Sequence, residues 1–232
     1  MTPPPRPVTF AILPVKRFLG AKARLGGDIS VGTRRALAES MVTDVLMALR
    51  RTPAVDSVFV VTSEPTADAI GRGYGATVLV DDVEEGQSAA VLIGIDHAIE
   101  QGAGRVLLVP GDTPALDPAE LGELLERPVV DPSVTIVPDR HGTGTNALIL
   151  TPPDIIEPSF GPDSRARHEQ LAHAAGVPVE VTHVETLAID VDTADDLEAL
   201  RQALANRRGG AAHTRGMLSR LAGRDRGTNP GS

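Results

Sequence analysis

The sequence predicts an α/β fold in which a mostly parallel, mixed sheet is covered by helices on both faces. Apolar stretches of strand length alternate with amphipathic stretches of helix length along much of the chain. The apolar stretches are continuous rather than interrupted at every second residue, which is typical of strands buried on both faces. With 232 residues, of which 41% are apolar, the chain is long enough to form one sizeable domain.

The first half of the chain alternates predicted strands and helices. Residues 8–15 form an apolar strand that leads into a loop rich in Lys and Arg, residues 16–28. Ser30 is the predicted N-cap of a helix that reaches Thr52, because apolar residues recur there every three or four positions. The alternation predicts βαβ units with right-handed crossovers. The further predicted elements are strands at 57–63, 76–80 and 105–110 and helices at 65–71 and 88–100.

The second half begins with a helix that Asp117 and Pro118 are predicted to start. Strands at 133–139 and 145–151 follow, close enough in the chain to form a hairpin. The remaining predicted elements are a helix at about 164–175, extended segments at 178–184 and 187–193, and a helix over 194–206 capped by Thr193.

We expect the folded domain to span residues 8–206, after a flexible N-terminus of residues 1–7. Residues 207–232 are rich in Arg and Gly and contain few apolar side chains, so they are predicted to be a disordered tail. No internal repeat is apparent.

Composition excludes several classes of function. The chain has 22 Lys and Arg against 31 Asp and Glu, and a net charge of −9 argues against nucleic acid as a partner. No stretch approaches the roughly 18 to 20 apolar residues that a membrane helix needs, and the Pro-rich start does not resemble a signal peptide, so we expect a cytoplasmic protein. The absence of Cys excludes disulfides and thiol nucleophiles, and leaves oxygen or imidazole as the ligands for any metal.

Four cations follow the first predicted strand. Lys16 and Lys22 are the only lysines of the chain, and Arg17 and Arg24 lie beside them. Ligands of open α/β sheets bind in the crevice beyond the carboxyl ends of the strands, so this loop is predicted to bind phosphates. The alternative is a solvated basic loop with no ligand.

Three acids are predicted to form a metal site. Asp112 follows an apolar strand directly, and Asp190 and Asp192 are alternate residues of an extended segment, so their side chains share one side while Val191 faces the core. Three carboxylates without Cys or a His pair favour a hard divalent cation such as Mg²⁺. The alternatives are that Asp112 is a turn or capping residue and that Asp192 only helps to cap the last helix.

Two further segments, HGTGTN at 141–146 and GPDSR at 161–165, combine small hydroxyl side chains with glycines. Ser164 is predicted to open a helix, and the free N–H groups of a helix start can bind a phosphate or a carboxylate. A glycine-rich turn followed by an ordinary N-cap is the alternative.

The segments VKRFLGAKARL, VPGDTPAL, GTGTNAL, FGPDSRARH and DVDTADDL resemble the guanylyltransferase family that makes the guanylylated three-carbon precursor of the deazaflavin coenzyme F-420. The resemblance covers about residues 8–205, and GTGTNAL with FGPDSRARH is its most specific part. It implies a Rossmann-like nucleotidyltransferase fold of the GT-A-like type. It also implies Mg²⁺ at Asp112, Asp190 and Asp192, and contacts to the acceptor at Thr145, Gly161 and Ser164.

The implied reaction joins GMP from GTP to a phosphorylated three-carbon acid and releases pyrophosphate. Bacterial members of the family use phosphoenolpyruvate, and archaeal relatives use 2-phospho-L-lactate. Because the second pKa of a phosphate monoester is near 6, the attacking phosphate needs no strong general base. Lys22, Arg24 and Asp112 are the expected catalytic residues, and the nucleotide is expected to contact Lys16, Lys22, Arg24, Gly86 and Ser88.

Other functions stay open at this point. Where the family has Gly-Leu-Asn, this chain has Gly86-Gln87-Ser88, a form more similar to the molybdenum-cofactor and sugar nucleotidyltransferases. The alternative that is not an enzyme is a nucleotide-sensing α/β domain. In that case Asp112 would have a regulatory role, and the basic loop would bind a partner. The choice among phosphoenolpyruvate, phospholactate and phosphoglycerate is open, as is the formation of a homodimer.

Overall fold

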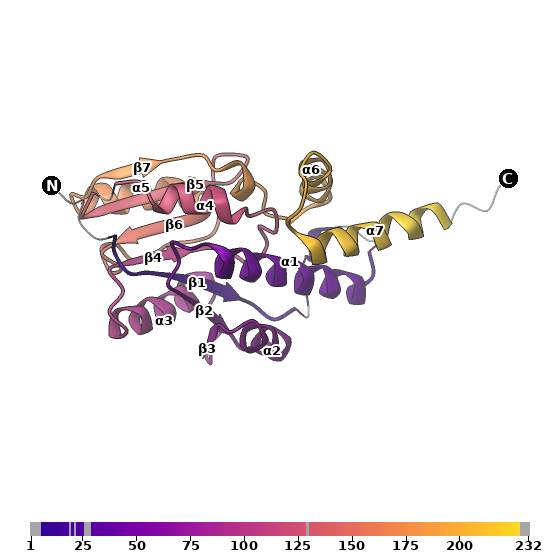
Figure 1. Cartoon of the computed structure of the whole chain (residues 1–232), viewed down its shortest axis with the longest axis horizontal. Coiled ribbons are helices and arrows are strands. Elements are labelled where there is room, and N and C mark those ends of the chain that lie inside the picture. Colours follow the sequence, from indigo (N-terminus) through magenta and orange to yellow (C-terminus); the bar gives the residue numbers. More distant parts are fainter. Residues whose placement is uncertain (1–5, 19, 21, 26–28, 129, 228–232) are drawn as a thin grey trace.

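The computed structural model describes residues 6–18, 20, 22–25, 29–128 and 130–227, with only the backbone given for 223–227. Its centre is a seven-stranded sheet in the order β3-β2-β1-β4-β6-β5-β7 (Figure 1). β6 is antiparallel to both of its neighbours, and every other pairing is parallel, as expected for a mixed, mostly parallel sheet. The strands are β1 (Thr9–Val15), β2 (Ser57–Thr62), β3 (Thr77–Val80), β4 (Arg105–Leu108), β5 (Ser133–Pro138), β6 (Thr145–Thr151) and β7 (Val179–Val181).

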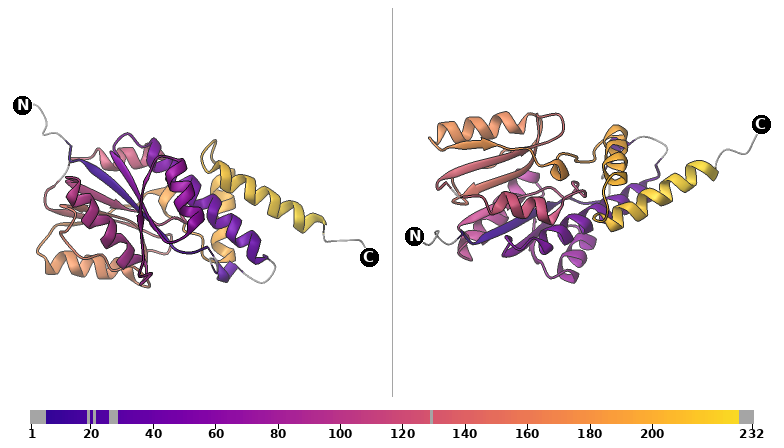
Figure 2. Two further views of the ribbon diagram at one scale, coloured as in Figure 1. Left: turned by 90° about the horizontal axis from the view of Figure 1, so that it is seen from below. Right: turned by 45° about the horizontal axis from the view of Figure 1, so that its top comes forward.

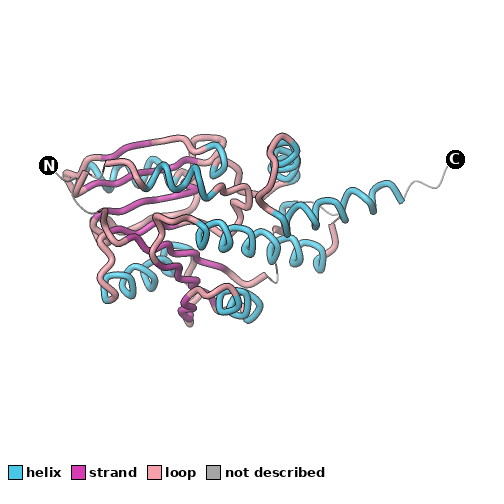
Figure 3. The backbone as a smooth tube through the Cα atoms, viewed as in Figure 1, coloured by secondary structure: helices cyan, strands magenta, loops and turns pink. Residues whose placement is uncertain are grey.

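Helices cover both faces of this sheet, as predicted (Figure 3). Alternate residues of β1 pack into opposite cores: Leu13 contacts the layer of α1, α2 and α4, whereas Ile12 contacts that of α3 and α5. The helix α3 comes especially close, because a Cβ on Gly94 would lie 2.5 Å from the Ile12 side chain. These helices are α1 (Val31–Arg51), α2 (Pro65–Gly73), α3 (Gln87–Glu100), α4 (Pro118–Leu125) and α5 (Ser164–Ala174).

Side chains close the helix starts where the sequence predicted caps. Ser30 Oγ accepts the N–H of Thr33 at 3.2 Å, and the Asp117 carboxylate accepts the N–H of Ala119 at 2.7 Å. Thr193 forms a reciprocal capping box with Asp196 at the start of α6 (Ala194–Ala205). The predicted helix starts at these three caps are therefore confirmed.

The order of the strands determines where a site can form. The chain moves from β1 through β2 to β3 on one side and then returns to place β4 on the other side of β1. The carboxyl ends of β1 and β4 are therefore neighbours at a topological switch point, where open α/β sheets bind ligands. Because β6 runs antiparallel to β4, β6 begins at the edge where β4 ends.

The C-terminal part corrects one prediction. Instead of a disordered tail, the chain forms α7 (Ala212–Gly227), which lies along α1 (Figure 2). Leu218 and Leu221 are buried against Leu37 and Met41 of α1 in a third apolar cluster. The few apolar residues of this segment fall on one helix face, and that arrangement outweighs the polar composition. Residues 228–232 lie outside the described residues.

At the other end of the chain, Arg6 forms an ion pair with Asp56 at 2.7 Å, and residues 1–5 of the predicted flexible N-terminus lie outside the described residues. Asp44 accepts the N–H groups of His213 and Thr214 at 3.1 and 2.7 Å, and so caps the start of α7 from α1. None of the helices within the described ranges is long and apolar enough to cross a membrane.

Candidate active site

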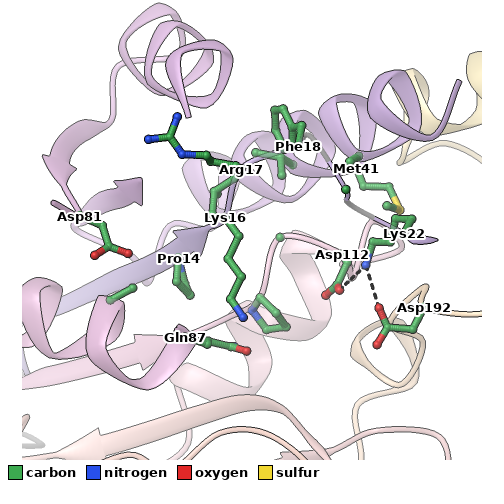
Figure 4. A pocket seen from close by; sticks show the side chains of 17 residues that line it. Pro14, Lys16, Arg17, Phe18, Lys22, Met41, Asp81, Gln87, Asp112 and Asp192 are labelled. Atoms are coloured by element: carbon green, nitrogen blue, oxygen red, sulfur yellow. Dashed lines mark hydrogen bonds and ion pairs between the residues drawn. The ribbon is translucent and has the colours of Figure 1, made fainter. Parts of the chain in front are cut away.

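A cavity of about 420 Å³ opens at the switch point, at the carboxyl ends of β1 and β4 (Figure 4). The segments 14–18 and 110–112, which follow these two strands, form much of its wall. Met41 of α1 and Gln87 of α3 contribute from the two helix layers, and Asp192 from the segment before α6. The cavity thus lies where the sequence predicted a ligand crevice.

Both lysines of the chain line this cavity. Lys16 is exposed and extends across it toward Gln87 (Figure 4). Lys22 is 10% exposed, and its Nζ donates to Asp112 Oδ2 at 2.6 Å and to Asp192 Oδ1 at 3.1 Å. Burial opposes the charge of Lys22, but the two carboxylates outweigh that effect and raise the pKa of its ammonium, which is therefore protonated.

The two arginines of the loop lie differently. Arg24 lies on the short helix η1 (Ala23–Leu25), is exposed, and is not among the residues that line the cavity. Arg17 lines the cavity, but its guanidinium pairs with Glu84, with Nη2 2.6 Å from Oε1. The structure therefore brings Lys16 and Lys22 to the cavity and leaves Arg24 outside it.

The three predicted metal ligands come together from two segments. The N–H of Val191 donates to the carbonyl oxygen of Asp112 at 3.1 Å, which joins the end of β4 to the segment before α6. Val191 is fully buried, as predicted, between Asp190 and Asp192. This segment is irregular and is not a strand of the sheet. Burial, followed by the charge of Asp112, raises the pKa of Asp190 to about 6.

The carboxylate oxygens of Asp112, Asp190 and Asp192 are donors of the kind that a hard cation prefers. In this structure the ammonium of Lys22 lies between Asp112 and Asp192. Within the described ranges, no three His, Asp or Glu side chains are arranged so that they could hold a metal ion. Asp112 Oδ1, however, is buried, and no described residue forms a hydrogen bond with it. An unpaired buried carboxylate oxygen beside two further carboxylates is the donor chemistry that Mg²⁺ prefers.

The residues at the start of α3 take separate roles. Gly86 is the N-cap of α3 with a φ of 113°, a conformation that favours glycine, and it lines a smaller neighbouring cavity of about 190 Å³. Ser88 lines neither of these two cavities, and its Oγ accepts the N–H of Phe160 at 2.9 Å. Gln87 and Asp81 line the main cavity, whereas Gly86 and Ser88 are the residues of this region that were predicted to contact the nucleotide. Asp81 follows β3 directly, so its position at a strand end could have identified it.

The predicted acceptor residues also come together. Ser164 Oγ lies 3.2 Å from Thr145 Oγ1, and both residues are buried. The carbonyl oxygen of Gly161 accepts the N–H of Ser164 at 3.1 Å. The N–H of Arg165 donates to Thr143 at 3.1 Å and thereby joins the loop before β6 to the start of α5.

Asn146 connects the predicted acceptor residues to Asp190. This connection was not predicted from the sequence. Val137 pairs with Ala147 and Pro138 with Thr145, so a bulge leaves Asn146 without a partner on β5. The Asn146 amide donates to Asp190 Oδ1 at 3.1 Å and to the carbonyl oxygen of Leu187 at 2.8 Å. The bulge thus lets adjacent residues of β6 serve two parts of the site.

Asp196 holds the acid segment from α6. Its Oδ2 accepts the N–H groups of Asp192 and Thr193, and its Oδ1 accepts Arg140 Nη2 at 2.6 Å. These bonds lower the pKa of Asp196 although burial opposes the shift, so the carboxylate stays charged. Through Arg140 and Asp196, the turn before β6 is therefore connected to Asp192, in addition to the bond between Asn146 and Asp190.

Comparisons with known proteins identify the family of this chain. The family model described as "Guanylyl transferase CofC like" matches residues 9–219. A phosphoenolpyruvate guanylyltransferase of Conexibacter woesei is 59% identical over 214 residues, which cover 92% of this chain and 96% of the relative. A protein of the same name from Sphaerobacter thermophilus is 37% identical, with 83% and 92% covered.

Solved structures show the same fold at low identity. A nucleotidyl transferase from Methanothermobacter is 19% identical with a TM-score of 0.64, covering 86% of this chain and 99% of that chain. A CMP:2-keto-3-deoxy-manno-octonic acid synthetase complexed with CTP is 14% identical with a TM-score of 0.55, covering 85% and 98%. The predicted nucleotidyltransferase fold is therefore confirmed.

Proposed function

Because this chain belongs to the family of CofC-like guanylyl transferases, we propose that it joins GMP from GTP to phosphoenolpyruvate and releases pyrophosphate. The product is enolpyruvyl-diphospho-guanosine, a precursor in the biosynthesis of coenzyme F-420. The proposal depends on one observation: the group of Lys22, Asp112 and Asp190 lies next to β6, the strand that carries the predicted acceptor residue Thr145. The bond from Asn146 of β6 to Asp190 connects the two. The names of the 59% and 37% identical relatives support phosphoenolpyruvate as the acceptor.

The nucleotide is proposed to lie in the cavity with its triphosphate toward the lysines. Two of the three donors of the Lys22 ammonium contact carboxylates, and no other described residue accepts from it, so the third donor can bind a phosphate oxygen. Lys16 extends across the cavity and adds a second cation. Gly86 is also proposed to contact the nucleotide, because it lines the neighbouring cavity. Arg24 and Ser88 are proposed as nucleotide contacts on the basis of the sequence alone.

Mg²⁺ is the proposed cofactor, and Asp112, Asp190 and Asp192 would hold it. When bound, it supplies positive charge that offsets the charge of the triphosphate and of the leaving pyrophosphate. The unpaired Asp112 Oδ1 supports this assignment from the protein side. Lys22 orients Asp112 and Asp192, and Asn146 orients Asp190, so this chain sets the positions of the three acids.

The acceptor is proposed to bind at Thr145, Gly161 and Ser164. Ser164 opens α5, an eleven-residue helix whose Asp163 N-cap makes no side-chain capping bond, so the first N–H groups there are not closed by that side chain. The phosphate of phosphoenolpyruvate is mostly ionised at neutral pH and attacks the α-phosphorus of GTP without a general base. The oxygen–phosphorus bond to pyrophosphate breaks as the new one forms.

We expect the enzyme to act in the cytoplasm, with a nucleotide and a phosphorylated three-carbon acid as its partners and with neither nucleic acid nor membrane. Both proposed substrates are small anions, and the net charge of −9 supports no polyanionic partner.

A direct assay tests the proposal. The purified protein is incubated with Mg²⁺ and GTP and with phosphoenolpyruvate, 2-phospho-L-lactate, 3-phosphoglycerate or a hexose phosphate, and pyrophosphate and the product mass are followed. Pyrophosphate release with phosphoenolpyruvate above all other acceptors supports the proposal, and CTP and ATP serve as controls for the base. Turnover with a sugar phosphate and not with any three-carbon acid would instead favour the alternative that Gly86-Gln87-Ser88 suggests.

A further inference from the structure

His168 lies behind the proposed acceptor residues, on α5, and contributes to no step described so far. Its side chain is fully buried, and its ring packs edge-on against Phe160 with the centroids 5.2 Å apart. Nδ1 lies 3.0 Å from Thr145 Oγ1, and Nε2 accepts the backbone N–H of Ser159 at 2.9 Å. Both nitrogens of the imidazole are therefore engaged inside the protein.

The contact with Ser159 determines which nitrogen of His168 carries the proton. A backbone N–H can only donate, so Nε2 must present a lone pair. The proton of the neutral ring then lies on Nδ1, which donates to Thr145. Burial, with the nearby charge of Arg167, lowers the pKa of His168 to about 4, in agreement with a neutral ring.

The direction of this bond determines the direction of the Thr145 hydroxyl. Thr145 Oγ1 accepts from His168 Nδ1 and also from Ser164 Oγ. A hydroxyl oxygen has two acceptor lone pairs and one proton, so with both lone pairs used the proton of Thr145 must point to a third partner. An anionic oxygen of the acceptor is a partner of this kind.

We propose that His168 is a positioning residue that fixes the Thr145 hydroxyl as a hydrogen-bond donor to an anionic group of the acceptor substrate. This inference rests on the proposed acceptor site and deepens it. The chain of bonds also reaches the nucleotide side, because Phe160, next to Ser159, donates its N–H to Ser88 at the start of α3. Hydrogen bonds of His168 and of the adjacent residues 159 and 160 thereby connect Thr145 to the start of α3, and Gln87 of this helix lines the main cavity.

Two substitutions of His168 distinguish an effect on the Thr145 hydroxyl from a purely structural role of the imidazole. In His168→Asn, the shorter side chain can place an amide N–H near the position of Nδ1 and keep the donation to Thr145. In His168→Gln, the longer side chain can place its amide oxygen near Nε2 and keep the bond from Ser159 while losing the donation to Thr145. His173→Gln is the matched control, because His173 lies exposed on the same helix.

The measurement is the KM of phosphoenolpyruvate and of GTP, with kcat, for each variant. We expect His168→Gln to raise the KM of phosphoenolpyruvate roughly tenfold or more, the value of one hydrogen bond to a charged group, while the KM of GTP changes little. His168→Asn should rescue much of this loss, and His173→Gln should behave as the wild type. In a Thr145→Val background the loss from His168→Gln should disappear, because no hydroxyl remains to be oriented.

An unchanged KM of phosphoenolpyruvate in His168→Gln, a larger loss in the Asn variant than in the Gln variant, or an undiminished effect in the Thr145→Val background would overturn the inference. If the Gln variant fails to fold, the Asn variant and Thr145→Ser still test it, because both keep the donor chain and should stay far closer to wild type than Thr145→Val. Absence of wild-type turnover with phosphoenolpyruvate would count against the proposed function instead, and the same variants would then be compared with the acceptor that is used.

Discussion

The ammonium of Lys22 lies 2.6 Å from Asp112, a residue ninety positions further along the chain, and 3.1 Å from Asp192, which is 170 positions away. This pair of contacts joins the loop after β1 to the two segments that carry the proposed metal ligands. The side chain of Lys22 is 10% exposed, so water screens its ammonium little, whereas the Asp192 carboxylate is 52% exposed. The site is therefore sensitive to the loss of any one of these charges.

Asp112→Asn is expected to reduce kcat on the order of 10²- to 10³-fold, the loss measured when a preorganised electrostatic group is removed from an active site. The amide can still accept from Lys22, so thermal melting should stay close to that of the wild type. Pyrophosphate release and a melting curve measure the two effects. Asp154→Asn, at an exposed position away from the cavity, is the control. Nearly normal turnover of the Asp112 variant would exclude Asp112 from the proposed metal site.

Asn146→Ala is expected to raise the Mg²⁺ concentration needed for half-maximal turnover, because Asp190 loses the amide that orients it. Residues that orient metal ligands typically contribute about 10- to 100-fold to metal affinity. Titration with Mn²⁺, followed by electron paramagnetic resonance, measures binding without turnover. Asn206→Ala, at the C-cap of α6, is the matched control. Equal Mn²⁺ affinity in the Asn146 variant and the wild type would contradict the prediction.

The main parts of the fold and the convergence of the site could be predicted because they follow from periodicity and topology. Asp112 had to lie at the ligand edge once the apolar stretch before it was identified as a parallel strand. Ser30, Asp117 and Thr193 identified helix starts because capping depends on neighbouring residues only. The contact between Thr145 and Ser164 followed from two specific motifs rather than from physics alone.

The features that escaped prediction depend on tertiary structure. Asn146 reaches Asp190 only because a bulge leaves it unpaired, and a bulge on one strand is determined by the partner strand. The position of Arg24 outside the cavity could not be predicted either, because the direction of a three-residue 3₁₀ helix cannot be inferred from periodicity. The segment of α7 has a polar composition and folds because α1 offers an apolar surface to it.

The packing of α7 on α1 predicts a loss of stability when it is weakened. Leu218→Ala removes a buried side chain from the third apolar cluster and should lower the free energy of unfolding by about 2 to 4 kcal/mol. Ser219→Ala, at an exposed position of the same helix, should have little effect. Urea unfolding followed by circular dichroism measures both variants. An equally small effect of the two substitutions would mean that α7 does not contribute to the folded domain.

The buried imidazole of His168 predicts a dependence of stability on pH. Burial, together with Arg167, lowers the pKa of His168 from its usual 6.5 to about 4, so between these values the unfolded chain binds more protons than the folded one. The stability from this group is complete above pH 6.5 and is lost as the pH falls toward 4. Between pH 8 and pH 5 the wild type should therefore lose roughly 1 to 2 kcal/mol more than His168→Asn in urea unfolding. His173→Asn should lose as much as the wild type, since His173 is exposed. Parallel pH profiles of the wild type and the His168 variant would show that the imidazole is not held neutral.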